Sequence, residues 1–381
     1  MVREHVWPNQ ERLRRTADAP RVLVAGGGTG GHAIPALCVA DSLKARGAAV
    51  EFVGSTAGIE ATLVPQAGYT LHPLPLLGLS GGASKRARAG VLFLRALSRC
   101  RRIIREFRPG AVLGVGGYAS APAVLAARAL GIPTFLHEQN SVPGRVNRFA
   151  SRFTREVFVT FPAAVGYLRH AVLVGMPTRE KFFGTSKEEA LERLGLEPPV
   201  VLVFGGSGGA LKLNLAAVEA FQDRTPYTVY QISGRRDFAR LSTENPRHKI
   251  VGYEDEIWHP LAASDLVVMR SGAASLFDAA AIGRAAILIP FPYATYDHQL
   301  YNARYFTEKR AAELLRDDEV AGKTLRARVE ELLDDEPYRE NLANNMRKLA
   351  TPRAADEVAV RLLEAANASA SALANAAAAN K

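Results

Sequence analysis

Short runs of apolar, mostly β-branched residues alternate with longer stretches of helical periodicity along almost the whole chain. Continuous apolar runs are typical of parallel strands buried on both faces, and the stretches between them are long enough for connecting helices. The predicted strands of the first half are Val22–Ala25, Val50–Gly54, Ala111–Val115, Thr134–His137 and Val157–Thr160. Those of the second half are Val172–Val174, Val200–Phe204, Tyr227–Ile232, Leu266–Met269 and Ala286–Pro290. The pattern therefore predicts an α/β protein.

The two series of strands predict two domains. Each series has its own glycine-rich first turn, and 381 residues are enough for two hydrophobic cores. We expect two Rossmann-like, doubly wound parallel-sheet domains that face each other across a cleft. The expected divisions are a polar extension (1–20), an N-terminal domain (21–175), a C-terminal domain (176–351), a helix (352–365) that packs back on the N-terminal domain, and a low-complexity tail (366–381).

Glycine-rich turns follow three of the predicted strands, in "GGGTGGH" (26–32), "GVGGYASAPA" (114–123) and "VFGGSGGA" (203–210). Where glycines lead a strand into a helix, free backbone N–H groups can bind phosphate, so the turns indicate a phosphorylated ligand. A dinucleotide-dependent oxidoreductase does not fit, because the second strand ends in "FVGSTAG" without an acidic residue and the glycine spacing differs from G-x-G-x-x-G. A P-loop nucleotidase does not fit either, because no G-K-[ST] follows the glycines.

Composition narrows the class further. The net charge is +10, which suits phosphorylated ligands or an acidic membrane surface. The two cysteines, Cys38 and Cys100, indicate idle thiols in a reducing compartment. No apolar run is long enough to span a membrane, and residues 1–20 lack the apolar core of a signal peptide, so we expect a cytoplasmic protein.

The segment "SKRARAGVLFLRALSRCRRIIREFRPG" is unusually basic and predicts an amphipathic helix. Phe93, Leu97, Cys100, Ile104 and Phe107 recur at helical spacing and predict a core-facing stripe. This helix follows the apolar loop "LPLLGLSGG", and three of its arginines lie on a different face from the apolar stripe. We interpret that arginine face as a peripheral patch that binds an anionic membrane surface. The alternative is a solvated helix. Nucleic acid is not expected, because interleaved aromatic residues are missing. The arginines are Arg95, Arg99 and Arg102.

Seven motifs occur in one order and resemble the MurG-type family of peptidoglycan N-acetylglucosaminyltransferases. They are "GGGTGGH", "GVGGYASAP", "LHEQNSVPG", "VGMPTR", "VFGGSGGA", "RSGAASLFDAA" and "PFPYATYDHQLYNA". The resemblance spans about Val22 to Arg361 and implies the GT-B fold. It further implies an inverting glycosyltransferase that moves N-acetylglucosamine from UDP to the muramyl 4-hydroxyl of undecaprenyl-pyrophosphoryl-N-acetylmuramyl-pentapeptide, converting lipid I to lipid II. Such an enzyme is peripheral, on the cytoplasmic face of the bacterial cell membrane. No D-x-D motif ends a strand, so we expect neither a metal nor another cofactor.

The resemblance also implies site residues. For the donor these are Asn140, Arg179, Ser207, Glu254, Asp278, His298 and Gln299, with Ala273, Ala274, Ser275 and Leu276 at a helix N-terminus beside the diphosphate. Thr29, Gly30 and Gly31 border the donor at the reacting centre, and Gly116, Gly117 and Tyr118 face the acceptor. For the general base two residues stay open, His32 and Glu138. At a helix N-terminus His32 is expected to stay neutral.

The chain departs from the family pattern at four of these loops. Met176 and Gly208 replace a usual asparagine and glutamine, Asp278 replaces the glutamate that grips the ribose, and Glu254 replaces an apolar residue near uracil. Two alternative functions remain. One is a UDP-N-acetylglucosamine 2-epimerase on the same architecture, and the other is a non-catalytic protein that binds a nucleotide sugar.

Overall fold

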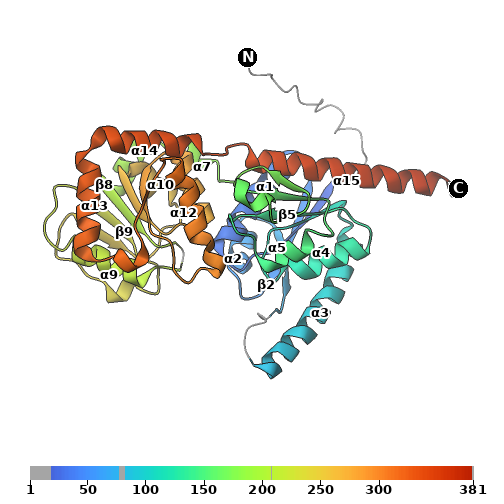
Figure 1. The fold of residues 1–381 in the computed structure, drawn as a ribbon. Helices are drawn as coiled ribbons and strands as arrows, with labels where there is room; N and C mark the ends of the chain where they lie inside the picture. The colour runs from blue at the N-terminus through green and yellow to red at the C-terminus, as the bar shows by residue number, and fades with distance from the viewer. Residues whose placement is uncertain (1–18, 77–81, 207, 380–381) are drawn as a thin grey trace, which may run out of the picture.

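The computed structural model describes residues 19–76, 82–206 and 208–379, which form two domains, each built on one parallel sheet (Figure 1). The N-terminal sheet has seven strands in the order β3-β2-β1-β4-β5-β6-β7. The C-terminal sheet has six strands in the order β10-β9-β8-β11-β12-β13. Both orders reverse beside the first strand, as in doubly wound folds, so the carboxyl ends of β1 and β4, and of β8 and β11, form switch points where ligands bind.

The strands of the first sheet are β1 (Arg21–Ala25), β2 (Ala49–Ser55), β3 (Thr70–Leu74), β4 (Ala111–Gly114), β5 (Thr134–Glu138), β6 (Glu156–Val159) and β7 (Ala171–Leu173). Those of the second are β8 (Val200–Phe204), β9 (Thr228–Ile232), β10 (His248–Val251), β11 (Leu266–Met269), β12 (Ala285–Leu288) and β13 (Glu313–Leu314).

Helices connect the strands. In the N-terminal domain they are α1 (Gly30–Ala45), α2 (Glu60–Gln66), α3 (Ala83–Phe107), α4 (Ser120–Ala129), α5 (Arg145–Ala150) and α6 (Pro162–Val165). The C-terminal domain has α7 (Lys181–Gly184), α8 (Lys187–Leu194), α9 (Leu211–Ala220), α10 (Trp258–Ala263), α11 (Ala273–Ile282), α12 (His298–Glu308), α13 (Gly322–Asp334) and α14 (Glu336–Lys348), and α15 (Ala354–Ala379) ends the chain. Short 3-10 turns are η2 (Phe238–Arg240), η3 (Thr295–Asp297) and η4 (Asp317–Glu319).

Each sheet is buried on both faces, which confirms the predicted α/β fold class. Along β1, Val22 and Val24 belong to one hydrophobic cluster, whereas Leu23 and Ala25 belong to the cluster on the opposite face. Neighbouring residues of β8 divide between two clusters in the same way. Because strand side chains alternate between faces, continuous apolar strands of this kind need a helical layer on each side.

Strand β7 corrects the sequence-based division of the strands. The series of strands places Val172–Val174 in the second half, whereas the expected boundary after residue 175 leaves this segment in the N-terminal domain. The structure agrees with the boundary, because β7 pairs with β6 at the edge of the first sheet, with Val157 opposite Ala171. The pattern also missed β3, β10 and β13. These lie at or next to sheet edges, where one side is exposed and the apolar run is interrupted by His72, Pro73 or Lys249.

Helix α15 continues to Ala379, well past the end near Ala365 that the sequence predicted. Residues 366–381 are expected from the sequence to form a low-complexity tail, but the segment is mostly alanine, the residue with the highest helix propensity. The first half of α15 packs on the N-terminal domain, where Val358 and Leu362 are fully buried in the cluster that also contains Val22 and Val24 (Figure 1).

Two chain segments cross between the domains and bind each other. Thr351 Oγ1 accepts a hydrogen bond from the Met176 amide (3.0 Å) and donates to the Met176 carbonyl (3.1 Å). Met176, one of the departures from the family pattern, is 1% exposed and packs in the core of the C-terminal domain. Phe161, at the end of β6, adds edge-on aromatic contacts to Phe277 and Tyr305 of that domain. The described residues therefore form one continuous body across the domain boundary.

Candidate active site between the two domains

The glycine-rich turns after β1 and β4 contact each other through their backbones. A Cβ atom on Gly26 would lie 2.5 Å from the Gly116 carbonyl oxygen, and one on Gly117 would lie 2.6 Å from the Gly27 carbonyl oxygen. The φ angles of Gly26, Gly116 and Gly117 are +137°, +92° and +75°, which L-residues with side chains rarely adopt. The close contact between the two turns therefore explains why glycine is required at these positions, which the sequence pattern alone had attributed to phosphate binding.

Two amides of the first turn are already used within the protein. The Gly26 N–H donates to the Val53 carbonyl (3.0 Å), and the Gly28 N–H donates to Glu60 Oε2 (2.6 Å). These groups are not available to a phosphate. Phosphate binding, which the sequence had inferred for all three glycine-rich turns, therefore loses support at this one.

His32 lies at the start of α1, directly after these turns. Its Nδ1 is 2.9 Å from Thr29 Oγ1, and a Cβ atom on Gly116 would lie 3.1 Å from its Nε2. Burial, with a contribution from His298 of the other domain, lowers the pKa of His32 to about 4, while Glu60 acts in the opposite direction. The imidazole is therefore neutral above about pH 4, as expected, although burial rather than the helix N-terminus is the main cause. Gly30 and Gly31 form the first residues of the same helix.

Glu138 ends β5 and is 3% exposed. Its Oε1 accepts from the Asn140 amide (3.0 Å) and side chain (3.4 Å), and its Oε2 accepts from the Gly144 amide (3.2 Å) and the Asn147 side chain (2.9 Å). Burial raises the pKa of Glu138, and these four bonds oppose that rise. With both oxygens occupied in this way, the carboxylate shapes the loop that follows β5.

That loop meets the C-terminal domain through Asn302 of α12, a residue that the sequence analysis did not single out. Asn302 is fully buried. Its Oδ1 accepts from the Ser141 amide (2.9 Å), and its Nδ2 donates to Asn140 Oδ1 (3.2 Å) and to the Ser271 carbonyl (3.3 Å). Its spacing offered a signal, because Asn302 follows His298 by four residues and so lies on the same helix face. Asn140, expected to bind the donor sugar, contacts the C-terminal domain through Asn302.

The loop before α12 places His298 and Gln299. The His298 Nδ1–H donates to the Thr295 carbonyl (2.8 Å), and Gln299 Oε1 accepts from the Phe291 amide (3.0 Å). Tyr296 and Asp297 have φ angles of +56° and +54°, an unfavourable conformation for residues with side chains. Such backbone strain persists where surrounding contacts hold it in place. Here the two strained residues directly precede His298 and Gln299, which were predicted to bind the sugar.

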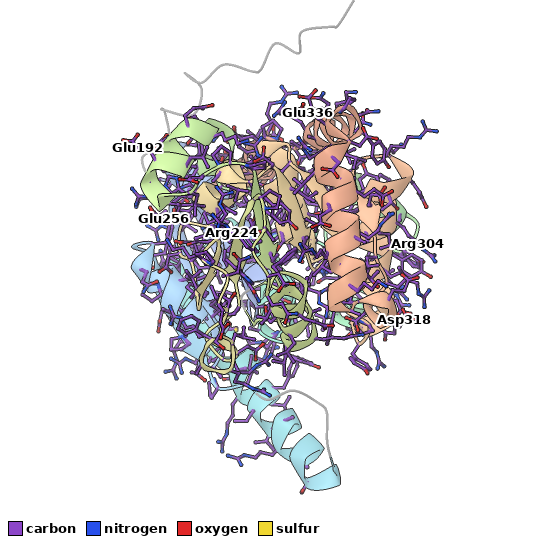
Figure 2. The ribbon with its side chains drawn as sticks, turned by 90° about the vertical axis from the view of Figure 1, so that its left-hand side faces the viewer. Glu192, Arg224, Glu256, Arg304, Asp318 and Glu336 are labelled. Atoms are coloured by element: carbon purple, nitrogen blue, oxygen red, sulfur yellow. The ribbon has the colours of Figure 1, made fainter. Side chains whose placement is uncertain are left out.

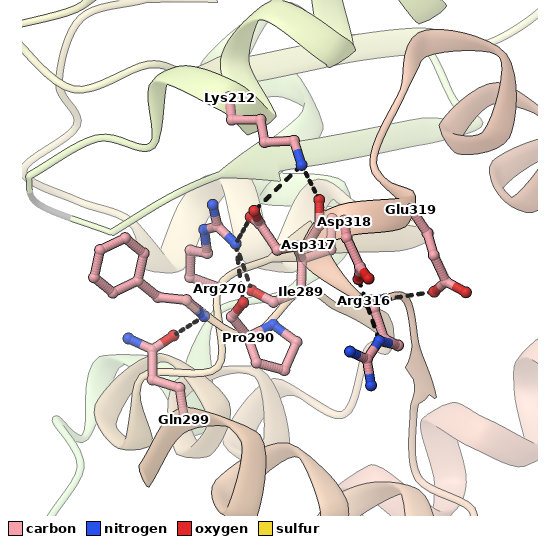
Figure 3. A network of polar contacts seen from close by, with 10 residues as sticks. Lys212, Arg270, Ile289, Pro290, Gln299, Arg316, Asp317, Asp318 and Glu319 are labelled. Atoms are coloured by element: carbon pink, nitrogen blue, oxygen red, sulfur yellow. Dashed lines mark hydrogen bonds and ion pairs between the residues drawn. The ribbon is translucent and has the colours of Figure 1, made fainter. Parts of the chain in front are cut away.

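A network of charges holds the loops at the carboxyl ends of the C-terminal strands (Figure 3). Arg270, after β11, forms an ion pair with Asp317 Oδ1 (2.6 Å) and donates to the carbonyls of Ile289 (3.2 Å) and Pro290 (3.1 Å). Lys212 of α9 contacts Asp317 from the other side, at 3.3 Å from Oδ2. The network therefore connects the helix after the third glycine-rich turn with the loops after β11 and β12.

Four of the predicted diphosphate residues, Ala273 to Leu276, form the start of α11. Gly272 is its N-cap, and no side chain among the described residues caps the helix, so the amides of its first turn, at Ala273, Ala274 and Ser275, have no side-chain partner. The Leu276 amide already bonds to the Gly272 carbonyl. Ser207 lies outside the described residues.

Arg179 lies close enough to Asp278, in the second turn of α11, to affect its pKa. The Arg179 guanidinium lies 5.0 Å from the ring centres of both Phe182 and Trp258. Burial raises the pKa of Asp278 to about 7, and Arg179 opposes the rise. Both groups also influence the pKa of the Cys38 thiol in α1, so this part of the C-terminal domain faces the N-terminal domain.

Glu254 has a local role in the structure. Its Oε2 accepts from the Tyr230 hydroxyl (3.2 Å) and its Oε1 from the Glu256 amide (3.1 Å), which fixes the turn after β10. Burial and Glu254 raise the pKa of Tyr230 to about 12. On the N-terminal side, Tyr118 follows the second glycine-rich turn and is 53% exposed.

The basic helix α3 projects from the N-terminal domain, away from the domain boundary (Figure 1). Its Cys100 and Ile104 are buried as predicted, and Leu97 and Phe107 are partly buried against the same cluster. Arg95, Arg99 and Arg102 are exposed, as are Val91 and Leu94. Leu74, the first residue of the predicted apolar loop, instead ends β3 and is fully buried. Residues 77–81 of that loop lie outside the described residues.

Figure 2 looks onto the C-terminal domain, where charged residues such as Glu192, Glu336 and Asp318 lie around the surface, with α3 projecting below. Over the described ranges no helix is both long and apolar enough to cross a membrane. The same part of the chain contains no group of three or more His, Cys, Asp or Glu side chains placed to hold a metal ion.

Comparison with known proteins gives consistent matches over both domains. Residues 22–159 match the glycosyltransferase family 28 N-terminal domain, and residues 200–358 match the glycosyltransferase family 28 C-terminal domain. The chain is 66% identical over 330 residues to a protein of Rubrobacter xylanophilus named UDP-N-acetylglucosamine–N-acetylmuramyl-(pentapeptide) pyrophosphoryl-undecaprenol N-acetylglucosamine transferase, covering 86% of this chain and 98% of the relative. A protein of the same name from Desulforudis audaxviator is 39% identical, covering 89% and 96%.

Solved structures agree on the fold. The crystal structure of MurG from Acinetobacter baumannii superimposes with a TM-score of 0.73 at 27% identity and covers 91% of this chain and 99% of its own. A UDP-GlcNAc 2-epimerase from Neisseria meningitidis superimposes with a TM-score of 0.65 at 13% identity, covering 90% and 100%. At that identity the second likeness concerns the fold alone.

The role of Asn302 can be tested by removing its side chain. Asn302→Ala leaves the buried Ser141 amide without a partner, and such a loss costs about 1–3 kcal/mol. We expect faster hydrogen exchange of the Ser141 amide and a correspondingly lower free energy of unfolding. Asn345→Ala on α14, which removes an amide that bonds to the Arg310 carbonyl (3.0 Å), is the control. Equal exchange at Ser141 in both variants would refute the bridge between the domains.

Proposed function

The chain belongs to glycosyltransferase family 28, in its MurG-type branch, and from that membership we propose the reaction of this protein. It is a UDP-N-acetylglucosamine-dependent glycosyltransferase of peptidoglycan synthesis. It transfers N-acetylglucosamine to undecaprenyl-pyrophosphoryl-N-acetylmuramyl-pentapeptide, which converts lipid I to lipid II. The observation that carries this conclusion is the 66% identity to a transferase of that name over 98% of the relative's length.

The alternatives have weaker support. The likeness to the 2-epimerase extends only to the fold, at 13% identity. A non-catalytic role had Asp278 as its main argument. An aspartate at this position still carries a carboxyl group, and it lies close enough to Arg179 for Arg179 to affect its pKa.

The transfer is proposed as one in-line displacement with inversion. The muramyl 4-hydroxyl loses its proton to a base as its oxygen bonds to the anomeric carbon, while the bond from that carbon to the UDP oxygen breaks and the electron pair leaves with the diphosphate. Two helix N-termini, at α11 and after the glycine-rich turn that contains Ser207, together with Arg179, stabilise the departing charge. Asn140, His298 and Gln299 are assigned to the sugar, Asp278 to the ribose, Glu254 to the region of the base, and Gly116, Gly117 and Tyr118 to the acceptor.

The contacts favour His32 over Glu138 as the base. His32 is neutral, and its Nδ1 contacts Thr29 Oγ1; in the tautomer whose Nδ1–H donates to Thr29, Nε2 is left to accept a proton. Glu138 instead accepts four hydrogen bonds that organise its own loop. A base with a pKa near 4 is weak, but a bound diphosphate brings negative charge that raises the pKa of a nearby imidazole.

We assign the membrane contact to α3, on the cytoplasmic face of the bacterial cell membrane. Its exposed Arg95, Arg99 and Arg102 lie near the exposed apolar side chains of Val91 and Leu94. A lipid-linked acceptor has to be reached at the membrane surface, and basic side chains next to apolar ones suit an anionic leaflet. Nucleic acid is not proposed as a partner.

The reaction itself is tested with purified protein, radiolabelled UDP-N-acetylglucosamine and a lipid I analogue. We expect a labelled disaccharide product. Arg179→Ala is expected to raise the KM for the donor about tenfold or more, because it removes a charge facing the diphosphate. Turnover is expected to persist in EDTA. A reaction abolished by chelation and restored by magnesium would contradict the proposed role of Arg179 and the helix amides, and absence of product would refute the transferase.

The base is tested with His32→Ala and Glu138→Gln. His32→Ala is expected to lower kcat by about a hundredfold, with the donor KM little changed. In the parent protein kcat falls as pH drops and His32 gains a proton, so this acidic limb is expected to vanish in the variant. Asp278, with a pKa of about 7, affects donor binding instead and is separated by measuring kcat at saturating donor. Near-normal kcat in His32→Ala with a collapse in Glu138→Gln would reverse the assignment.

The membrane contact is tested by flotation with anionic vesicles. Each basic residue near such a surface contributes about 1 kcal/mol, so the Arg95, Arg99 and Arg102 triple alanine variant is expected to lose most binding. Binding of the parent protein is expected to fade with salt. The matched control removes three exposed arginines of the C-terminal domain, Arg224, Arg240 and Arg304, which changes the net charge equally. Figure 2 labels Arg224 and Arg304 on the face of that domain. Equal loss in both variants would show that overall charge, and not α3, is responsible.

A further inference from the structure

Glu60 is a buried acidic residue that none of the assigned roles uses. It is the first residue of α2 and is 1% exposed. Its Oε2 accepts from the Gly28 amide (2.6 Å) and its Oε1 from the Ser55 amide (2.8 Å). None of the ion pairs among the described residues includes it. Burying a carboxyl group without a cation is costly, so its position needs an explanation.

Three glycines from two segments make room for this side chain. A Cβ atom would lie 2.2 Å from the Glu60 carboxyl carbon if placed on Gly27, 2.1 Å from Oε2 if placed on Gly58, and 2.6 Å from Cγ if placed on Gly54. Any side chain at these positions would displace the carboxyl group. Part of the glycine content of the first turn and of "FVGSTAG" therefore follows from Glu60.

The Glu60 contact continues to the imidazole of His32. Gly28, held by Glu60, directly precedes Thr29, and Thr29 Oγ1 lies 2.9 Å from His32 Nδ1. Thr29 is the N-cap of α1, yet its side chain makes no capping bond to the helix backbone and contacts the ring instead. When Nδ1 carries the proton and donates to Thr29, Nε2 is the nitrogen that can accept one.

The charges near His32 also favour an imidazole that can accept a proton. The titratable groups that face His32 are Glu60 of α2, His298 of α12 and His137 of β5. Glu60 raises the pKa of His32, whereas burial and His298 lower it. His137 is itself buried, and its pKa is lowered to about 4. Glu60 is thus the acidic member of this group.

We propose that Glu60 is a positioning residue for the transfer reaction. It holds the first glycine-rich turn so that Thr29 fixes the His32 ring with Nε2 free, and its negative charge stabilises the imidazolium that forms when His32 takes the acceptor's proton. This role rests on the function proposed above. Glu60 itself touches neither substrate.

The test is Glu60→Gln, which keeps the shape of the side chain but removes its charge and turns an amide NH₂ toward one of the two backbone donors. We expect kcat to fall by about tenfold or more, the scale of a weakened general base, with the donor KM changed by less than about twofold. The acidic limb of kcat is expected to move to lower pH, because loss of the carboxylate lowers the pKa of His32. A merely structural role would lower stability and leave that limb in place.

A second measurement does not depend on turnover. The ¹⁵N chemical shifts of the His32 ring in the full-length protein show which nitrogen carries the proton at neutral pH. We expect Nδ1–H to dominate in the parent protein and a mixture of tautomers in Glu60→Gln. If Glu60→Gln fails to fold, Gly58→Ala is the second variant, because its methyl group must displace the carboxylate, and the same change in ring tautomers is expected.

Glu219→Gln is the matched control. Glu219 Oε2 also accepts a glycine amide, from Gly322 at 3.2 Å, and a Cβ atom on Gly322 would lie 2.5 Å from its side chain, but it belongs to the C-terminal domain. We expect normal turnover and an unchanged His32 ring in this variant. An unchanged His32 tautomer and acidic limb in Glu60→Gln would overturn the role of Glu60. Absence of transfer by the parent protein would refute the transferase, while the ring measurement would still decide whether Glu60 positions His32.

Discussion

The turns after β1 and β4 touch backbone to backbone, and this contact decides what else the N-terminal domain can place there. Gly26 and Gly117 approach carbonyl oxygens so closely that no side chain fits between the turns. The space beside them is filled by the His32 ring on one side and by the Glu60 carboxyl group on the other. The neutral His32 imidazole and the Glu60 carboxyl group therefore lie beside a turn whose glycine-rich sequence, taken by itself, would indicate an anion-binding site.

The domain boundary depends on a small number of buried polar contacts. Asn302 satisfies the Ser141 amide and binds Asn140, while Thr351 ties the two crossing segments together at Met176. Buried polar groups are costly unless paired, so these bonds favour one relative placement of the domains. That placement brings His298 close enough to His32 to contribute to the lowered pKa of His32. A transfer between a donor on one domain and an acceptor on the other requires such a fixed approach.

The sequence predicted the fold class, because continuous apolar strands have few other solutions, and it predicted most central strands closely. It failed at edges such as β3, where exposure mixes polar residues into the pattern, and at α15, where alanine was interpreted as low complexity instead of helix. Motifs indicated the loops that carry Glu138, His298 and Gln299. They did not indicate Glu60, because it binds backbone amides of segments that only the folded chain brings near. Asn302 lies within the last motif, four residues after His298, but its partners Ser141 and Asn140 come from the other domain.

Burial has a common effect on ionisable groups near the domain boundary. It lowers the pKa of His32 to about 4 and raises that of Asp278 to about 7, so each is shifted toward its neutral form. Under the proposed function this matters, because a diphosphate leaving group brings negative charge that an ionised carboxylate would repel. In the proposed donor complex, a protonated Asp278 would both donate to and accept from the ribose diol, which would compensate for its shorter side chain. Arg179 and the α11 amides would then meet the diphosphate with little opposing charge. Glu60 would keep its carboxyl group on the proposed acceptor side, where proton transfer creates positive charge.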